Sequence, residues 1–245
     1  MISVASAEFF VGLISFFLAY VVSVTIAQAF RAWTAYMVGD DTGKELGYMT
    51  LNPFFHIDAF SIIILEIFYA LGIYTAWSPY IPLDIARIEK PFRAVKVALC
   101  FLSTSFAYFM TALCGIIALV ATFDVKVLSL TRYMVLFHQM SHLYLAQVYP
   151  TYSSWLVVVG FILISLVYLN MILCVFTFIT DMFSLYIMWY RERTTHQAMS
   201  GSYSMILIPL LLLIFFSGFL RLLAVNAITA IGLCISSRCG IITPY

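Results

Sequence analysis

The segment VGDDTGKELGYMTLNPFFHID, residues 38–58, lies between two apolar stretches, residues 4–30 and 59–80. Its acidic and turn-forming residues stand out, because 64% of the chain is hydrophobic and only 9% is charged. A soluble domain carries about 25% charged residues, so most of this chain cannot face water. The segment is therefore expected to connect two membrane spans, with lipid as the solvent for most of the chain.

Apolar stretches that are long enough to cross a bilayer determine the predicted fold. A transmembrane helix needs about 20 mostly apolar residues. The stretches that meet this requirement are residues 4–30, 59–80, 95–123, 152–190 and 205–235. The last two are long enough to be broken, so we predict an all-α polytopic integral membrane protein with five or six transmembrane helices. It forms a single domain over residues 1–245, with a small β-like insert at residues 48–52.

The connectors on both sides of the second span are expected to be structured. Asp58 precedes an apolar run and suits a helix N-cap, while His56 is expected to hydrogen-bond within the loop. Turn residues and short polar side chains predict that residues 38–58 pack against the membrane domain. Residues 82–96 space their apolar side chains three and four positions apart, which predicts an interfacial helix.

Residues 36–58 resemble the bacterial intramembrane zinc proteases of the site-2 protease family. Many members carry Leu-Gly-Asp-x-Thr-Ala-Lys, then Gly-Arg-Leu-Thr-Leu-Asn-Pro and His-Ile-Asp-Pro. The positions that match in register are Asp40, Thr42, Lys44, Gly47, Thr50, Leu51, Asn52, Pro53, His56, Ile57 and Asp58. Residues 77–96 are also similar to the family's Trp-Ala-Lys-Pro-Val-Pro-Val loop. The residues assigned to this inherited family loop are Asn52, Pro53, His56 and Asp58.

The same resemblance indicates which catalytic residues this chain lacks. Family members carry His-Glu-x-x-His on a helix, where two imidazoles bind one zinc and the glutamate activates its water. The register here is AQAFRAWTAY, residues 27–36, with Ala27 and Arg31 at the ligand positions and Gln28 at the base position. Alanine offers no ligand atom, arginine stays protonated, and glutamine cannot take a proton from water. We therefore assign no catalytic residue, no metal ligand and no cofactor.

Two further places in the sequence bear on a metal site. The family's third zinc ligand is an aspartate in a Pro-Pro-Leu-Asp-Gly turn, and the best candidate is Asp181 in VFTFITDMFS. It lacks the prolines and the glycine, so the ligand role is not assigned to it. His138 and His142 stand at i and i+4 in FHQMSH, which allows a relocated metal site. Two interfacial histidines are the favoured interpretation, because no third ligand is evident nearby.

Glu66, Asp181 and Arg221 are ionisable residues within apolar stretches. A charge there costs about 2.5–3.5 kcal/mol or more, so it usually faces a partner or a wet cavity. We expect Arg221 to pair with Glu66 or Asp181 and so to fix the packing of the helices. A polar transport path is the alternative interpretation of these charges.

These observations predict a non-catalytic homologue of the site-2 proteases that acts as a binding or structural subunit in a bacterial or organellar inner membrane. Membrane lipids and a membrane-protein partner are expected. The net charge of +1 argues against nucleic acid as a partner. The alternatives are a divergent zinc metalloprotease that uses His138, His142 and an acid such as Asp181, and a transporter or channel-like subunit.

Overall fold

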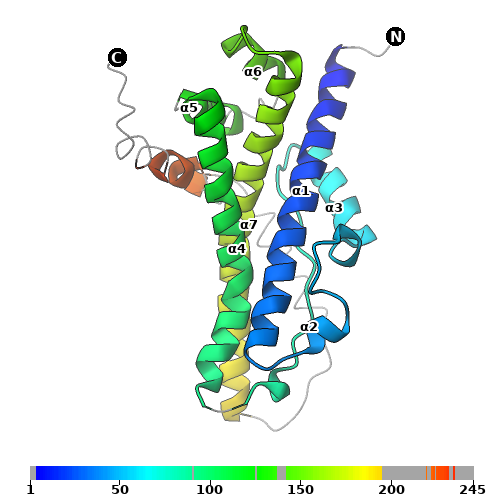
Figure 1. Ribbon diagram of the computed structural model, residues 1–245, viewed down its shortest axis with the longest axis vertical. Helices are drawn as coiled ribbons and strands as arrows, with labels where there is room; N and C mark the ends of the chain where they lie inside the picture. The colour runs from blue at the N-terminus through cyan, green and yellow to red at the C-terminus, as the bar shows by residue number, and fades with distance from the viewer. Residues whose placement is uncertain are drawn as a thin grey trace.

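The computed structural model describes residues 4–89, 91–124, 126–136 and 142–194, together with residues 219, 222, 223, 225–231 and 234. Its elements are α1 (Val4–Met37), α2 (Thr42–Glu45), η1 (Pro53–Phe55), α3 (Ala59–Ala70), η2 (Ile85–Arg87), α4 (Arg93–Phe123), α5 (Lys126–Leu136), α6 (His142–Val148) and α7 (Ser154–Thr194). Every regular element in this part of the chain is helical (Figure 1). The all-α prediction is confirmed for the residues described.

The long helices α1, α4 and α7 pack against one another and form the bundle that carries the other elements (Figure 1). Within the described residues, 3 stretches are long and apolar enough to cross a membrane, namely Glu8–Met37, Arg93–Phe123 and Ser154–Met188. The shorter apolar helix α3 has 12 residues and contacts α1. These lengths agree with the prediction of a multi-pass helical membrane protein.

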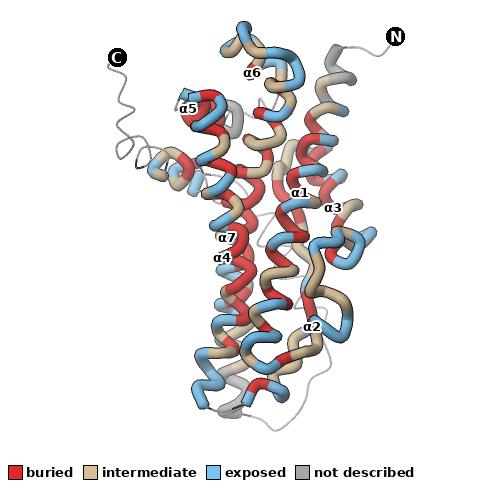
Figure 2. Tube along the Cα trace, viewed as in Figure 1, coloured by how far each residue is buried: buried red, intermediate tan, exposed pale blue. Residues whose placement is uncertain are grey.

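Buried residues lie along the three long helices where these pack together (Figure 2). Small residues let the helices approach closely: a Cβ added to Gly115 of α4 would lie 2.6 Å from Cγ2 of Val167 on α7. Polar side chains also join the helices, because the Asn170 amide donates to Ser23 Oγ at 2.6 Å across α7 and α1. Lipid provides no hydrophobic driving force for the association of helices, so close packing and interhelical hydrogen bonds hold this bundle together.

The second predicted span, residues 59–80, is wrong in its second half. Helix α3 ends at Ala70, and the amide of Ile73 bonds the carbonyl of Phe68 at 2.8 Å. Gly72 follows the helix at a φ of 72°, and this left-handed residue completes a Schellman-type end. Residues 73–84 then run without helix or strand. Hydropathy alone predicted a span here because it does not register such a stop signal.

The β-like insert predicted at residues 48–52 is also wrong, since the described residues contain no strand. The hydrogen bonds of this segment are local instead of between strands: Tyr48 N bonds Gly43 O at 2.8 Å, and Asn52 N bonds Thr50 Oγ1 at 3.2 Å. A strand requires a neighbouring strand to take its ladder bonds, and none of the described segments supplies one. The apolar and β-branched residues form a bend that leads into η1.

The interfacial helix predicted at residues 82–96 is reduced to η2, which has 3 residues. Phe92 has a left-handed φ of 62°, so a continuous helix cannot pass through it into α4. Of the two alternatives for residues 152–190, the single long helix is observed as α7. Most of the fifth predicted span, residues 205–235, lies outside the described residues.

Candidate functional site

The polar loop between α1 and α3 is packed rather than loosely tethered. Asp40 is fully buried, and its two carboxylate oxygens accept from the amides of Thr42 at 3.0 Å and Asp84 at 2.9 Å. One side chain thus joins the turn after α1 to the segment before η2. Gly43 packs closely on α1, since a Cβ added there would lie 3.1 Å from Cβ of Ala32.

On the exposed side of the same loop, Arg87 contacts three acidic side chains. Its guanidinium bonds Asp41, lies 3.1 Å from Glu45 Oε2, and lies 3.3 Å from Asp84 Oδ2. The hydrogen bond from Arg87 lowers the pKa of the Asp41 carboxyl, and the same bond raises the pKa of Arg87. This network is exposed to solvent, so it orients η2 and α2 more than it stabilises the fold.

The four residues assigned to the family loop have local structural contacts. Asn52 caps η1 by accepting from Phe54 N at 3.2 Å, and Pro53 begins that turn. Asp58 caps α3 by accepting from Ser61 N at 2.6 Å, which confirms the predicted N-cap. His56 Nε2 lies 2.6 Å from the carbonyl of Thr50, as expected of a residue that closes the loop.

Acidification is expected to loosen this loop through His56. Burial lowers the pKa of His56 below its usual value of 6.5, although the bond to the Thr50 carbonyl acts in the opposite direction. Below about pH 6.5 the unfolded loop therefore binds more protons at His56 than the folded loop does. The contribution of neutral His56 to stability is fully present above that pH and is lost as the pH falls further. Trypsin should cut at Lys44 faster at pH 5 than at pH 7, once each rate is divided by the rate at which trypsin cuts a short unstructured peptide at the same pH. His56→Gln keeps a donor for Thr50 and should remove the difference; an equal pH effect in that variant would contradict the assignment.

Helix α1 places the residues of the zinc-motif register inside the bundle. Ala27 is fully buried, and Gln28 is 2% exposed. The Gln28 amide nitrogen donates to Ser78 Oγ at 2.8 Å and to the carbonyl of Pro79 at 2.5 Å. Ser78 Oγ also lies 2.8 Å from the hydroxyl of Tyr108 on α4. The residue at the base position therefore acts as a hydrogen-bond donor to neighbouring protein groups.

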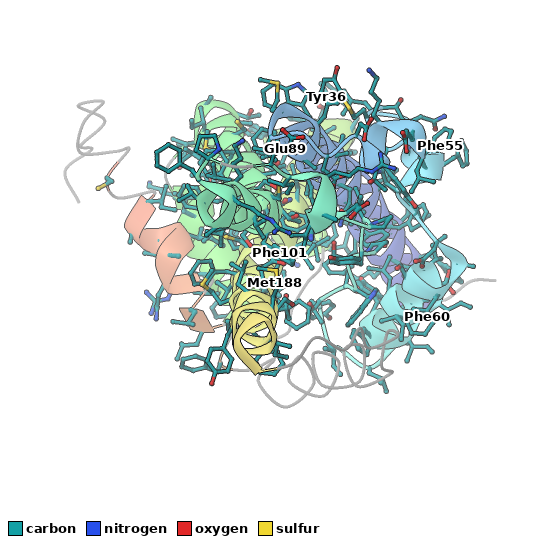
Figure 3. All side chains as sticks on the ribbon, turned by 90° about the horizontal axis from the view of Figure 1, so that it is seen from below. Tyr36, Phe55, Phe60, Glu89, Phe101 and Met188 are labelled. Carbon is teal, nitrogen blue, oxygen red and sulfur yellow. The ribbon has the colours of Figure 1, made fainter. Side chains whose placement is uncertain are left out.

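Arg31, at the second ligand position, faces the carboxylate that the resemblance had offered as a third ligand. Its Nη1 lies 3.7 Å from Asp181 Oδ1 on α7 and 3.4 Å from Thr104 Oγ1 on α4. Its guanidinium carbon lies 4.7 Å from the ring centroid of Tyr80 and 5.3 Å from that of Phe101. Phe101 packs in a cluster with Met188 of α7, next to which it appears in Figure 3. One cation thus links α1, α4 and α7.

These residues do not fit a zinc ion. Ala27 has no lone pair to offer, Gln28 turns its nitrogen toward acceptors, and the protonated guanidinium of Arg31 lies beside the carboxylate of Asp181. A dication in this place would be repelled by Arg31. Across the described part of the chain, no group of three His, Cys, Asp or Glu side chains is placed to hold a metal ion.

The relocated metal site is not supported by where its residues lie. His142 begins α6, and its ring centroid lies 6.4 Å from that of Phe161, near the start of α7. Asp181 follows Phe161 by 20 residues on the same helix, which corresponds to about 30 Å. These two side chains therefore cannot share one ion in this fold. His138 lies outside the described residues.

Of the three ionisable residues predicted within apolar stretches, Asp181 and Glu66 lie in the described part of the chain and Arg221 does not. Asp181 meets Arg31, a pairing that the sequence did not predict. Glu66 lies on the exposed side of α3. Arg221 lies outside the described residues, so its expected pairing with Glu66 or Asp181 stays a prediction. Sequence reasoning missed Arg31 as a buried charge because the apolar run ends at Phe30, although the helix continues to Met37.

Ser78, Tyr80, Thr104 and Tyr108 were also missed as contacts of the motif positions. Their only sequence signal was indirect: Ser78 and Tyr80 belong to the stretch similar to the family's Trp-Ala-Lys-Pro-Val-Pro-Val loop. Thr104 and Tyr108 lie in LSTSFAY, residues 102–108, within the third apolar stretch. These four side chains lie together in space, around Gln28 and Arg31.

Comparison with known proteins gives a partial match to a protease relative. A Bacillus subtilis (strain 168) protein described as "Putative zinc metalloprotease YwhC" is 37% identical over 71 residues, which are 29% of this chain and 30% of that protein. The chain thus aligns with less than a third of the relative's length. That relative is a site-2 protease family member, so the similarity to this family is distant and partial. No family model and no solved structure matches the chain.

Proposed function

We propose that this chain is a non-catalytic relative of the site-2 proteases that serves as a binding or structural subunit of a membrane complex. The contact between Arg31 and Asp181 carries this proposal: the resemblance assigns Arg31 to a ligand position of the zinc motif, and the contact supports a positive charge that stays in that position. Three features together oppose zinc binding and catalysis: the positive charge of Arg31, the missing ligand atom at Ala27 and the amide of Gln28 in place of a base. Restoring any one of the three would leave the other two obstacles.

The chemistry of Gln28 supports the same conclusion. Hydrolysis of a peptide by a metalloprotease needs a general base that takes a proton from water. A carboxamide has no suitable pKa, and the Gln28 nitrogen already donates to Ser78 and Pro79. Gln28 therefore supports the structure and cannot activate water.

The proposed location and partner rest on the resemblance and on the helices. Three stretches suited to crossing a membrane make the chain an integral membrane protein, and the resemblance favours a bacterial or organellar inner membrane. We infer a membrane-protein partner from the loss of catalysis in a chain that keeps a packed polar loop. Gentle detergent extraction followed by identification of co-purifying proteins tests this part of the proposal.

We expect the purified protein to contain no stoichiometric zinc and to show no chelator-sensitive peptidase activity. The physical reason is the combination of Ala27, Gln28 and Arg31 at positions that would have to bind zinc and activate water. Metal content is measured by mass spectrometry, and activity by incubating the reconstituted protein with transmembrane peptides, with and without a zinc chelator. Zinc that is lost on His138→Ala, or cleavage that the chelator stops, would favour the divergent metalloprotease instead.

A further inference from the structure

Residues 73–84 form a segment without helix or strand that is buried in part. Thr75 is 3% exposed, Ala76 is fully buried and Ile81 is 1% exposed. In Figure 1 this segment connects α3 to η2 and runs along the bundle beside α1. Irregular backbone at membrane depth is tolerated only where protein buries it or where it lines a wet cavity. The buried residues of the segment therefore belong to the interior of the bundle.

The segment is attached to all three long helices. The ring centroid of Trp77 lies 6.3 Å from that of Phe176 on α7. Ser78 Oγ lies 2.8 Å from Gln28 Nε2 on α1 and 2.8 Å from the Tyr108 hydroxyl on α4. A loop that merely connected two helices would not need side-chain contacts with three separate elements.

The segment covers Gln28 and Arg31, two of the three motif positions on α1. Gln28 donates to the backbone carbonyl of Pro79 at 2.5 Å, so an extended peptide presents its carbonyl to the base position. The Tyr80 ring lies over Arg31; Tyr80 is 61% exposed, whereas Arg31 beneath it is 3% exposed. The aromatic ring is thus the outer cover of the buried cation, and the Pro79 carbonyl accepts from the amide nitrogen of Gln28.

We propose that residues 73–84 are a built-in occupant of this site, an extended peptide of the chain itself that excludes any second polypeptide from Gln28 and Arg31. The inference deepens the proposed function and rests on it, because it states how the substituted site is kept closed. A partner polypeptide must then bind the outer faces of the helices. The segment uses the amide nitrogen of Gln28 as a hydrogen-bond donor to its own backbone at Pro79 and to its own side chain at Ser78.

Photo-crosslinking tests this placement without destabilising the site. Trp77 is replaced by p-benzoylphenylalanine, which is also aromatic, and the protein is irradiated in its native membrane. We expect an intrachain cross-link to α7 around Phe176, identified by mass spectrometry. A cross-link to lipid or to another polypeptide, without the one to α7, would overturn the proposal. The same label at Trp155, which is exposed at the start of α7, is the control and should not reach the α7 residues near Phe176.

Thiol labelling tests whether Gln28 holds the segment. Cys100 is fully buried in a cluster with Ile88 and the adjoining Leu83 and Ile85, so it reports opening at this end of the segment. In a variant whose other cysteines are serine, Gln28→Leu should raise the rate of maleimide labelling at Cys100 by about tenfold, the factor expected for losing about 1.4 kcal/mol of attachment. The matched control Gln147→Leu changes an exposed residue on α6 and should leave the rate unchanged. Equal rates in the two variants would refute the anchoring role.

The two proposals fail in different measurements. Chelator-sensitive cleavage would refute the lack of catalysis and leave the cross-link between position 77 and α7 unaffected. Absence of that cross-link, in a protein that binds no zinc and cleaves nothing, would refute only the built-in occupant. If Gln28→Leu does not fold, the cross-link experiment on an otherwise unchanged chain decides the question alone.

Discussion

Replacing Arg31 with Met is expected to lower the free energy of unfolding by about 3–5 kcal/mol, because the change leaves a buried carboxylate without its cation. Asp181 is 6% exposed, and the Arg31 guanidinium lies 3.7 Å from it. Methionine keeps much of the length and apolar surface of the arginine stem, so packing against the rings of Tyr80 and Phe101 changes little. The effect therefore reports the loss of charge. Unfolding is measured in mixed detergent micelles at neutral pH.

A second variant separates the ion pair from general disruption. Arg31→Met combined with Asp181→Leu removes both charges and should recover most of the lost stability, since replacing a whole buried pair by apolar residues is often neutral. Arg93→Met is the matched control, because Arg93 is exposed at the start of α4 and should tolerate the change. If the double variant is no more stable than Arg31→Met alone, the pair does not hold the helices together.

The long spans were predictable because their signal is local. Length and hydropathy within one stretch were enough to predict α1, α4 and α7, and Asp58 was recognisable as a cap because it stands directly before an apolar run. The end of α3 was missed although its signal, Gly72 followed by Pro79 and Pro82, is also in the sequence. An apolar stretch remains apolar whether it crosses the membrane or lies extended inside the bundle, so hydropathy could not distinguish the two.

The candidate site required information that is not local. Arg31 and Asp181 are separated by 150 positions, the difference between their residue numbers, and each has a neighbourhood that predicts nothing about the other. The resemblance placed Arg31 at a ligand position, but the weak match around Asp181 did not justify the third-ligand role. Only the packing of α1 against α7 brings them together. The bend that replaced the β-like insert follows the same rule, because a strand depends on a partner elsewhere in the chain.

Two neighbouring aspartates give the sharpest test of the loop. Asp40→Ala is expected to cost about 2–4 kcal/mol, since it leaves the amides of Thr42 and Asp84 without their acceptor. Asp40 is fully buried, so water does not readily replace the lost carboxylate. Trypsin should then cut rapidly at Lys44 in native membranes while the helices stay intact.

Asp41→Ala is the matched control for that experiment, because it removes the same side chain one position along the chain. The Asp41 side chain is 51% exposed, and Arg87 also contacts Glu45 and Asp84, so the loss of Asp41 should leave cutting at Lys44 and the unfolding transition nearly unchanged. The comparison separates two effects: the hydrogen bonds that the buried Asp40 carboxylate accepts from backbone amides, and the charge contact of Asp41 with Arg87 at the surface. Equal sensitivity of the two variants would mean that the charge network around Arg87, and not Asp40, joins the loop to the segment before η2. Rapid cutting of the unaltered protein at Lys44 would show that neither contact keeps the loop packed.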